Sequence, residues 1–241
     1  MTFRTNEFDQ PIGEPISNWQ PALRPAKVTL EGNFCSLVPL SMEHSAELFA
    51  AYTSSPDPTP QHHIANSNIW TYLRQGPFAS LTEYETWVHG AITSQDAITY
   101  SVINTETSKP VGTLSLMRID TANGVIEVGN VVFSPLMQGT ALSTEAQFLL
   151  MQYVFDQLNY RRYEWKCDSL NAPSMRAAER LGFTYEGTFR NAVVYKGRNR
   201  DTAWYSITDT EWEHLRPAFQ QWLSTSNFID GKQIRRLQDL R

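Results

Sequence analysis

The sequence predicts an α+β fold in which helices flank one central, mostly antiparallel sheet. Short segments that alternate apolar and polar residues, as half-buried strands do, recur between residues 34 and 207. Longer segments with apolar residues at helical spacing lie between them. No repeat, low-complexity run or clear linker divides the chain, so we expect one domain over residues 34–223.

Both ends of the chain differ in character from this domain. Residues 1–33 contain Pro11, Pro15, Pro21 and Pro25 and show little periodicity. Proline restricts its own backbone and that of the preceding residue, which favours an extended strap over an independent domain. Residues 224–241 read as a polar tail.

The first half of the domain predicts a strand followed by two helices. Residues 34–40 alternate in polarity, and Ser41 can cap a helix that continues to residue 52. The proline-rich run at residues 54–60 predicts a loop. Ser80 and Glu83 form a capping box before a second helix with apolar residues at helical spacing.

The second half predicts strands with two helices between them. Residues 98–102 and 111–117 read as strands, and Asn123-Gly124 supplies a hairpin turn into the strand 125–133. A long helix follows over residues 142–158, and a short strand covers 163–167. Asn171 caps the next helix, which ends at Gly182. After strands at 185–189 and 203–207, Asp209 is expected to cap a last helix that Pro217 interrupts.

The stretch from Val131 to Ala146 combines a buried strand, a loop of small residues and the first turn of a helix. A helix begins with unpaired backbone N–H groups, and its dipole favours negative charge at that end. The stretch therefore fits a phosphate or pyrophosphate site. An ordinary turn between a strand and a helix would leave the same pattern.

Composition narrows the class of protein. A hydrophobic fraction of 41% supports a packed core, and a net charge of −5 argues against a nucleic-acid partner bound through a general basic field. No signal peptide or membrane span is evident, and Cys35 and Cys167 lie far apart. We therefore expect a cytoplasmic protein without a membrane partner, as a monomer or homodimer.

Positive charge is concentrated in residues 161–200, which hold nine Lys or Arg and four Asp or Glu. This block follows the predicted phosphate loop, which suggests an anionic ligand, although a solvated face would look the same. His62 and His63 form the one histidine pair, but no cysteine or carboxylate lies nearby at ligand spacing, so no metal is expected.

Several of these motifs occur together in one order. The strand at Glu127-Val128-Gly129 precedes the loop Gln138-Gly139-Thr140-Ala141, and Asn171-x-x-Ser174 and Leu181-Gly182-Phe183-x-x-Glu186-Gly187 with Arg190 follow. Over roughly Phe34 to Trp212 the chain resembles the GNAT acyltransferases, and within them the ribosomal-protein N-acetyltransferases of the RimJ/RimL type. The resemblance implies a GNAT-type fold whose middle strands splay apart, with acetyl-CoA as co-substrate and no metal.

The resemblance also implies which residues hold acetyl-CoA. The pantetheine would lie along Val131, Val132 and Phe133, and the pyrophosphate on backbone N–H groups of Gln138, Gly139, Thr140, Ala141, Leu142 and Ser143. Asn171 and Ser174 could bind pantetheine, and Arg176 and Arg180 could face the phosphates; capping and solvated helix charges are the alternatives. The family pattern Gln/Arg-x-x-Gly-x-Gly/Ala is matched imperfectly, because Ala141 and Ser143 stand at its later small positions.

Two residues are candidates for proton transfer. Glu127 could accept a proton from an ammonium group through a water, or it could be an exposed carboxylate of an edge strand. Many relatives protonate the leaving thiolate with a tyrosine, but this chain has Ala178 at that position. Ser174 is the expected substitute, with pantetheine binding or packing as its alternative roles.

The acceptor is expected to bind near the aromatic residues Trp70, Tyr72 and Phe78, unless these belong to the core. The predicted activity is direct acetyl transfer from acetyl-CoA to a primary amine, either a protein N-terminus or a small molecule. A non-catalytic acyl-CoA-binding module is the alternative. Cys167 as an acyl-carrying nucleophile is disfavoured, because no histidine lies near it in the sequence.

Overall fold

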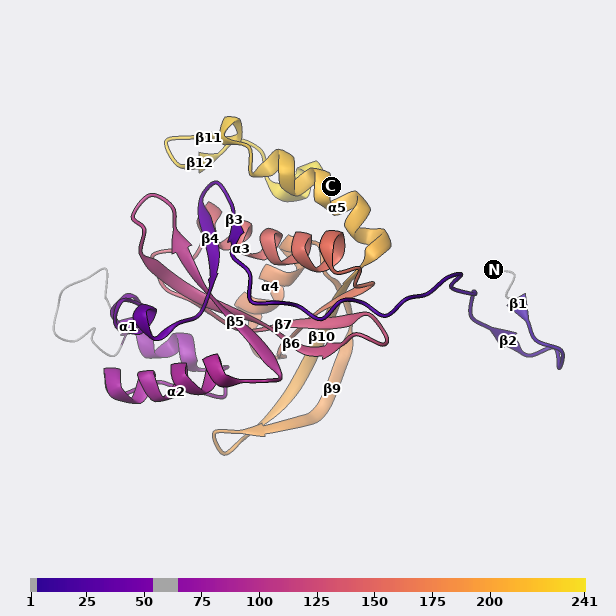
Figure 1. Ribbon diagram of the computed structural model, residues 1–241, viewed down its shortest axis with the longest axis horizontal. Coiled ribbons are helices and arrows are strands. Elements are labelled where there is room, and N and C mark those ends of the chain that lie inside the picture. Colours follow the sequence, from indigo (N-terminus) through magenta and orange to yellow (C-terminus); the bar gives the residue numbers. More distant parts are fainter. Residues whose placement is uncertain (1–3, 54–64) are drawn as a thin grey trace.

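One eight-stranded sheet forms the centre of the molecule, in the order β3-β4-β5-β6-β7-β8-β10-β9 (Figure 1). The computed structural model describes residues 4–53 and 65–241. All neighbouring strands are antiparallel except β7 and β8, which confirms the expected mostly antiparallel sheet. The strands are β3 (Leu30–Glu31), β4 (Cys35–Pro39), β5 (Ala97–Asn104), β6 (Pro110–Asp120), β7 (Val125–Phe133), β8 (Arg162–Asp168), β9 (Thr184–Tyr195) and β10 (Arg198–Thr208).

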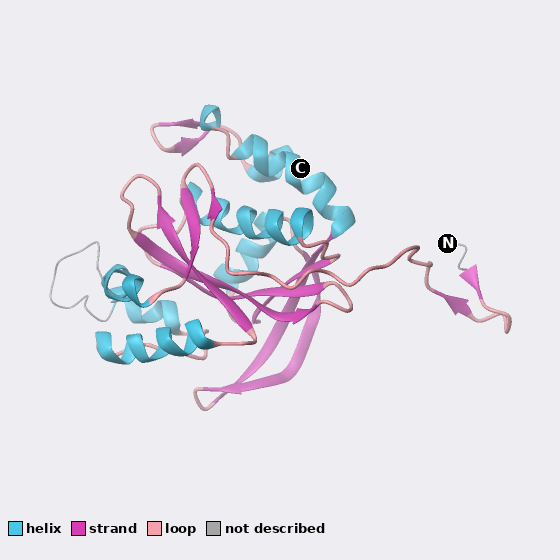
Figure 2. Ribbon diagram, viewed as in Figure 1, coloured by secondary structure: helices cyan, strands magenta, loops and turns pink. Residues whose placement is uncertain are grey.

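Helices cover both faces of this sheet and create two hydrophobic cores. The main core contains residues of α3, α4 and α5, and the second core contains residues of α1 and α2. Figure 2 also shows β9 and β10 as a long ribbon that projects beyond the rest of the sheet. The helices are α1 (Ser45–Thr53), α2 (Leu81–Thr93), α3 (Ala141–Gln152), α4 (Ala172–Leu181) and α5 (Asp209–Trp222).

Most of the predicted caps and turns are present. Ser80 accepts a hydrogen bond from the Glu83 backbone at the start of α2, and Asn171 caps α4. Gly182 ends α4 with a φ of +98°, a conformation that glycine adopts without steric cost. Gly124 occupies the hairpin turn between β6 and β7 with a φ of +62°.

The last helix differs from the expectation in two respects. Its cap is Thr208 and not Asp209. The Thr208 hydroxyl accepts a hydrogen bond from the Glu211 backbone N–H, and the Glu211 carboxylate accepts one from the Thr208 backbone N–H. Pro217 lies inside α5 without interrupting it. Leu215 and Phe219, two residues before and after Pro217, are both buried in the main core.

A β-bulge in β7 decides which side chains face which core. Residues 129–132 of β7 pair with residues 113–115 of β6, so β7 has one extra residue. Asn130 lies in this bulge with a φ of +49°, which asparagine tolerates better than most residues. Val128 before the bulge and Val131 after it both contact the main core, whereas Val132 packs in the second core.

The parallel pair β7 and β8 separates after four residues. Val125 to Val128 pair with Arg162 to Trp165, and no pair of these two strands follows within the described residues. Beyond that point β7 continues against β6, and β8 continues against β10. The middle of the sheet therefore opens into a gap, as the resemblance implied.

The ends of the chain are attached to the domain to different degrees. In the expected strap, β1 (Arg4–Thr5) and β2 (Pro11–Ile12) form a small hairpin apart from the body (Figure 1), whereas β3 joins the main sheet. The backbone N–H of Ala22 donates to Thr121. Residues 224–241, expected as a polar tail, form the hairpin β11 (Phe228–Ile229) and β12 (Lys232–Gln233) and bury Leu237 completely.

Glu145 connects the start of α3 to the turn before β4. Its carboxylate accepts hydrogen bonds from the backbone N–H groups of Asn33, Phe34 and Cys35, at 2.8, 2.6 and 2.7 Å. The side chain is buried, and its carboxylate points toward the turn between β3 and β4. The backbone at Gly32 passes so close that any β-carbon there would collide with this carboxylate.

We expect Glu145→Gln to lower the free energy of unfolding by about 2 kcal/mol, because an amide NH₂ group would replace one of the two oxygens that accept from the backbone of residues 33–35. Denaturant unfolding followed by circular dichroism measures this change. Glu213→Gln on the exposed surface of α5 is the matched control and should change stability little. Equal stability of the two variants would contradict the structural role of Glu145.

Candidate active site

Two cavities meet where β7 and β8 separate. The larger has a volume of about 1030 Å³ and extends to the start of α3. The smaller has a volume of about 390 Å³ and contains Glu127. Five residues line both cavities and therefore mark the passage between them: Tyr72, Val131, Trp165, Asn171 and Ser174.

The start of α3 presents a helix N-terminus to the larger cavity without a side-chain cap. The N-cap residue Thr140 makes no capping hydrogen bond, because its hydroxyl donates to the Met137 carbonyl at 2.7 Å. The Ser143 hydroxyl likewise donates to the Thr140 carbonyl. The N–H groups of the first helical turn thus have no side-chain partner, and an anion could bind them.

The predicted pyrophosphate residues are not equivalent in this loop. Five of the six line the larger cavity: Gln138, Gly139, Thr140, Ala141 and Ser143. Leu142 does not line it, and its carbonyl lies 3.7 Å from the Cys35 thiol. The backbone N–H groups of Gln138 and Thr140 already donate to carbonyls within the loop. Gly139 has a φ of +72°, so glycine gives the loop its turn before the helix.

Arg180 adds a positive charge to the larger cavity. Its guanidinium donates to the Thr144 hydroxyl at 2.9 Å and lies 5.1 Å from the centre of the Trp222 ring. Burial lowers the pKa of this arginine, with Arg241 acting in the same direction. Arg176, one turn earlier in α4, is exposed and lines neither cavity. The structure therefore separates the two arginines that were expected together.

The predicted pantetheine strand lies along the open edge of β7. Val131 lines both cavities, and Val132 and Phe133 line the larger one. The Val132 carbonyl accepts a hydrogen bond from the buried Tyr52 hydroxyl at 3.3 Å. The Gln138 side-chain amide donates to the Phe133 carbonyl at 2.7 Å, which fixes the loop to the strand end.

Ser174 lies at the passage between the cavities, in the first turn of α4. Its backbone N–H donates to the Asn171 side chain at 3.2 Å, and its hydroxyl oxygen accepts from the Trp165 indole at 3.0 Å. A hydroxyl that accepts such a bond keeps its own proton free to donate. This arrangement suits a proton donor, although it also positions the serine for hydrogen bonding alone.

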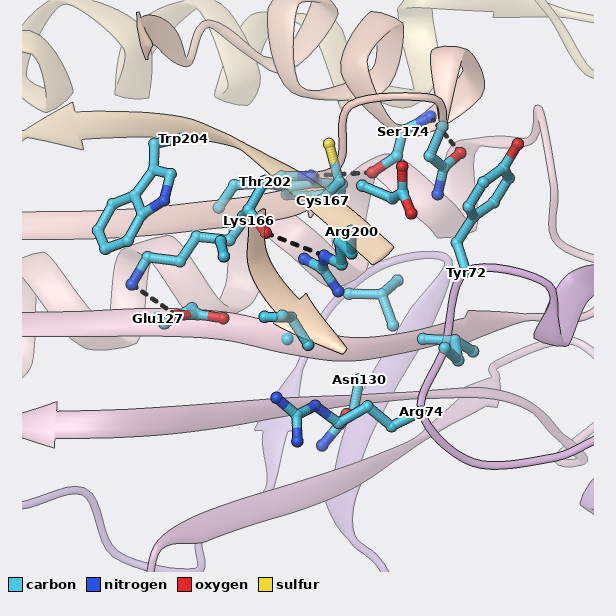
Figure 3. Close-up of a pocket in the computed structure, with 18 of the residues that line it drawn as sticks. Tyr72, Arg74, Glu127, Asn130, Lys166, Cys167, Ser174, Arg200, Thr202 and Trp204 are labelled. Atoms are coloured by element: carbon cyan, nitrogen blue, oxygen red, sulfur yellow. Dashed lines mark hydrogen bonds and ion pairs between the residues drawn. The ribbon is translucent and has the colours of Figure 1, made fainter. Parts of the chain in front are cut away.

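Glu127 is buried in the smaller cavity, so it is not the exposed carboxylate that the alternative assumed. Its carboxylate pairs with Lys166 Nζ at 2.9 Å (Figure 3) and with Arg118 Nε at the same distance. Burial raises the pKa of Glu127 above its ordinary value, although Lys166 and Arg118 act in the opposite direction. A carboxyl with a raised pKa is a better proton acceptor than an exposed one.

The neighbouring carboxylate of Glu164 shares the same lysine. Glu127 and Glu164 are direct partners in the parallel pair β7–β8, so their side chains lie on one face of the sheet. Lys166 Nζ contacts Glu164 at 2.6 Å and lies 3.7 Å from the centre of the Trp204 ring. Figure 3 shows Lys166 reaching toward Glu127 beside Trp204. One buried ammonium thus holds two adjacent carboxylates.

The three aromatic residues expected at the acceptor site lie in different places. Tyr72 lines both cavities, and its hydroxyl donates to the Leu170 carbonyl at 3.1 Å. Trp70 is buried in the second core, where its ring contacts Tyr52 and Phe78 edge-on. Neither Trp70 nor Phe78 lines either cavity. Of the three, Tyr72 alone is in a position to contact a ligand there.

Cys167 lines the smaller cavity but lacks the surroundings of a nucleophile. The side chain is buried, and this burial raises the pKa of its thiol. The chain's two cysteines are free thiols in the structure. A protonated, buried thiol is a poor nucleophile.

Other features of the sequence analysis bear less on the site. No group of three histidine, cysteine or carboxylate side chains that could hold a metal occurs in the described part of the chain, and His62 and His63 lie outside it. Among residues 4–53 and 65–241, no helix is both long and apolar enough to cross a lipid bilayer.

Sequence reasoning missed several residues that line the cavities. Lys166 lies two residues after Glu164, the partner of Glu127, so strand alternation places it on the face of Glu127 once the strand pairing is known. Arg118 reaches the same carboxylate through an irregularity in β6 after Met117, where its own φ is +49°. The C-terminal hairpin contributes Lys232 and Gln233 to the larger cavity, and Trp222 of α5 lies beside them. Their sequence context carries no motif that points to a ligand.

Comparison with known proteins identifies the family. Residues 36–184 match the family described as Acetyltransferase (GNAT) domain. A crystal structure of a GCN5-related N-acetyltransferase from Brucella melitensis is 46% identical, with a TM-score of 0.87, and the match covers 93% of this chain and 99% of that chain.

Two curated relatives extend this result. The uncharacterized N-acetyltransferase p20 of Bacillus licheniformis is 27% identical over 170 residues, which are 69% of this chain and 89% of that protein. YdaF of Bacillus subtilis, named as a ribosomal N-acetyltransferase, is 30% identical over 102 residues, 42% of this chain and 55% of that protein. The second relative agrees with the expected RimJ/RimL-like branch. Because the family match spans more than half of the chain, this protein belongs to the GNAT acetyltransferase family and is an acyltransferase.

Proposed function

We propose that this enzyme transfers an acetyl group directly from acetyl-CoA to a primary amine. The observation that carries the proposal is the junction of the two cavities. One cavity extends to an uncapped helix N-terminus suited to phosphate, and the other contains a buried carboxylate suited to deprotonating an amine. The thioester would lie at the passage, beside Val131 and Ser174.

The larger cavity offers suitable groups along the length of acetyl-CoA. The first turn of α3 would bind the pyrophosphate, with Arg180 and Lys232 as further positive charges. The open edge of β7 would bind the pantetheine amides as an added strand does. Asn171 and Ser174 stand at the end of this path, where the acyl group would be.

The smaller cavity would hold the amine. The amine nitrogen attacks the thioester carbonyl, a C–N bond forms, and the C–S bond breaks. The ammonium must first lose a proton, for which Glu127 is the proposed base. Four residues separate Glu127 from Val131 on β7, which is about 13 Å at the rise of a strand, so the proton would pass through water.

The leaving thiolate requires a proton, which Ser174 would supply. Its hydroxyl lines the passage and is oriented by the Trp165 indole. Among the side chains of the passage, Tyr72 also carries a hydroxyl, but this group donates to the Leu170 carbonyl. Ser174 is therefore the better-placed proton donor.

Binding and turnover measurements test the function against the alternative of a non-catalytic acyl-CoA-binding module. We expect calorimetry to show CoA binding, weakened roughly tenfold in Arg180→Gln through loss of a charged contact. Thiol release from acetyl-CoA should occur with amines drawn from small molecules and N-terminal peptides. CoA binding without turnover for any amine would support the non-catalytic module instead.

Glu127→Gln should lower kcat/KM about 100-fold, the range expected for loss of a general base. The base acts when deprotonated, so the rate of the unaltered enzyme rises with pH through the pKa of Glu127, which lies above the usual glutamate value. This rise should be absent from the pH profile of the variant. Glu106→Gln, in the turn between β5 and β6, is the control, and an unchanged profile in Glu127→Gln would assign the base role elsewhere.

Lys166→Met should lower the free energy of unfolding by about 3 kcal/mol at neutral pH, because Glu127 and Glu164 lose the buried charge that they share. The loss should shrink as the pH falls, since protonation of either carboxyl removes the repulsion. Denaturant unfolding at two pH values measures this. Adding Glu127→Gln to Lys166→Met should recover most of the stability, and no recovery would contradict the shared-charge account.

A further inference from the structure

The smaller cavity is strongly basic although the protein is acidic. Its lining includes five cationic side chains and two carboxylates, a net charge of +3 in a chain whose net charge is −5. The five cations are Arg74, Arg118, Lys166, Arg190 and Arg200. Such a cavity attracts anions and repels a simple ammonium ion, which is unexpected for a site that only binds amines.

The two carboxylates of this cavity are already bonded. Glu127 pairs with Lys166 and Arg118. Asp168 accepts hydrogen bonds from the Tyr195 hydroxyl at 2.8 Å and from the Leu170 backbone at 2.9 Å. These interactions leave three arginines of the cavity that form no ion pair with any described residue: Arg74, Arg190 and Arg200.

The three arginines come from separate elements that converge on one cavity. Arg74 lies in the loop between the 3-10 helix Ala65–Trp70 and α2, Arg190 lies on β9, and Arg200 lies on β10. The Arg200 side chain is half-buried, and its Nε donates to the Thr202 hydroxyl at 3.1 Å. This bond orients the guanidinium, whose terminal nitrogens have no hydrogen-bond partner among residues 4–53 and 65–241. Figure 3 shows Arg200 and Arg74 in the same cavity.

The phosphates of acetyl-CoA do not explain these charges. The larger cavity has its own cations in Arg180 and Lys232, and it has no carboxylate in its lining. Arg74, Arg190 and Arg200 line the smaller cavity alone. The anion that they would bind is therefore not part of the acetyl donor.

We propose that the acceptor is a small primary amine that also carries a carboxylate or phosphate group, bound by Arg74, Arg190 and Arg200. This inference rests on the proposed acetyl transfer to an amine and defines its substrate class. A guanidinium binds a carboxylate or phosphate through two parallel hydrogen bonds, so the arginines would orient the acceptor as well as attract it. A cavity of about 390 Å³ suits a small molecule.

Calorimetry on the CoA-saturated protein tests the anion site without turnover. CoA occupies the helix N-terminus, so added anions cannot bind there. The probes are two matched pairs, phosphoethanolamine with ethanolamine and γ-aminobutyrate with butylamine. In at least one pair, we expect the member with the carboxylate or phosphate to bind roughly tenfold or more tighter than the member without it, with binding that weakens as salt is added.

Substitutions test whether the preference for amines with an anionic group depends on the arginines. Arg200→Gln and Arg74→Gln should each reduce the anionic preference roughly tenfold, whereas Arg236→Gln, an exposed arginine that lines neither cavity, should leave it unchanged. Arg74 is exposed, so its variant remains informative if Arg200→Gln fails to fold. Equal binding of both members in both pairs, or preferences unaffected by these variants, would overturn the proposal.

Acetylation rates separate this inference from the proposed function. Equal acetylation rates for amines with and without an anionic group would overturn the inference and leave the acetyl transfer intact. Arginine-dependent anion binding without acetylation of any amine would overturn the proposed transfer, and with it the acceptor assignment, and would leave only the anion site. Acetylation of the peptide Ala-Glu-Ala in preference to Ala-Gln-Ala, with no turnover of the small anionic amines, would overturn the small-molecule assignment in favour of an acidic peptide N-terminus.

Discussion

The separation of β7 from β8 is the constraint on which the site depends. Backbone N–H and C=O groups of a strand require partners, and buried ones are seldom left without them. Past Val128 and Trp165 each strand keeps its outer neighbour and loses its inner one. The inner edges can then be satisfied by water or by a ligand that lies between them. The bulge at Asn130 falls at this point, where it also reverses the faces of the following residues.

A network of charges holds the strands together just before they separate. Glu127 and Glu164 lie side by side on neighbouring strands. Two negative charges that are adjacent and shielded from water repel each other strongly. Lys166 contacts both carboxylates, Arg118 contacts Glu127, and Arg162 contacts Glu164 at 2.8 Å. Burial raises the pKa of the proposed base Glu127, and Lys166 and Arg118 of this network act in the opposite direction. Structural support and chemical tuning thus come from one set of residues.

Local signals made the fold and part of the site predictable. The loop before α3 and the segment from Asn171 to Gly182 are defined by neighbours in the sequence, through caps, glycine conformations and helical spacing. The roles of Trp70 and Phe78 were not predictable, because a cluster of aromatic residues suits a core as well as a ligand site. Only tertiary packing distinguishes the two.

The basic residues of the smaller cavity illustrate the same limit. Positive charge in residues 161–200 was visible, but it could equally have coated a solvated face. Arg190 and Arg200 meet Arg74 only because the long β9–β10 ribbon folds back beside the segment that precedes α2. Arg74 lies more than one hundred residues from Arg190 and Arg200 in the sequence, so no local sequence pattern connects them.

The contacts of Glu145 have a consequence for where the folding unit begins. The region shared with the family starts at residue 36, yet the buried carboxylate of Glu145 takes its hydrogen bonds from residues 33–35. A chain shortened to the shared region would leave this charge buried without its donors, at a cost of several kcal/mol. The helix that begins at the proposed pyrophosphate site is therefore anchored by residues outside the family domain. The physical boundary of this domain lies upstream of residue 36, where the family match begins.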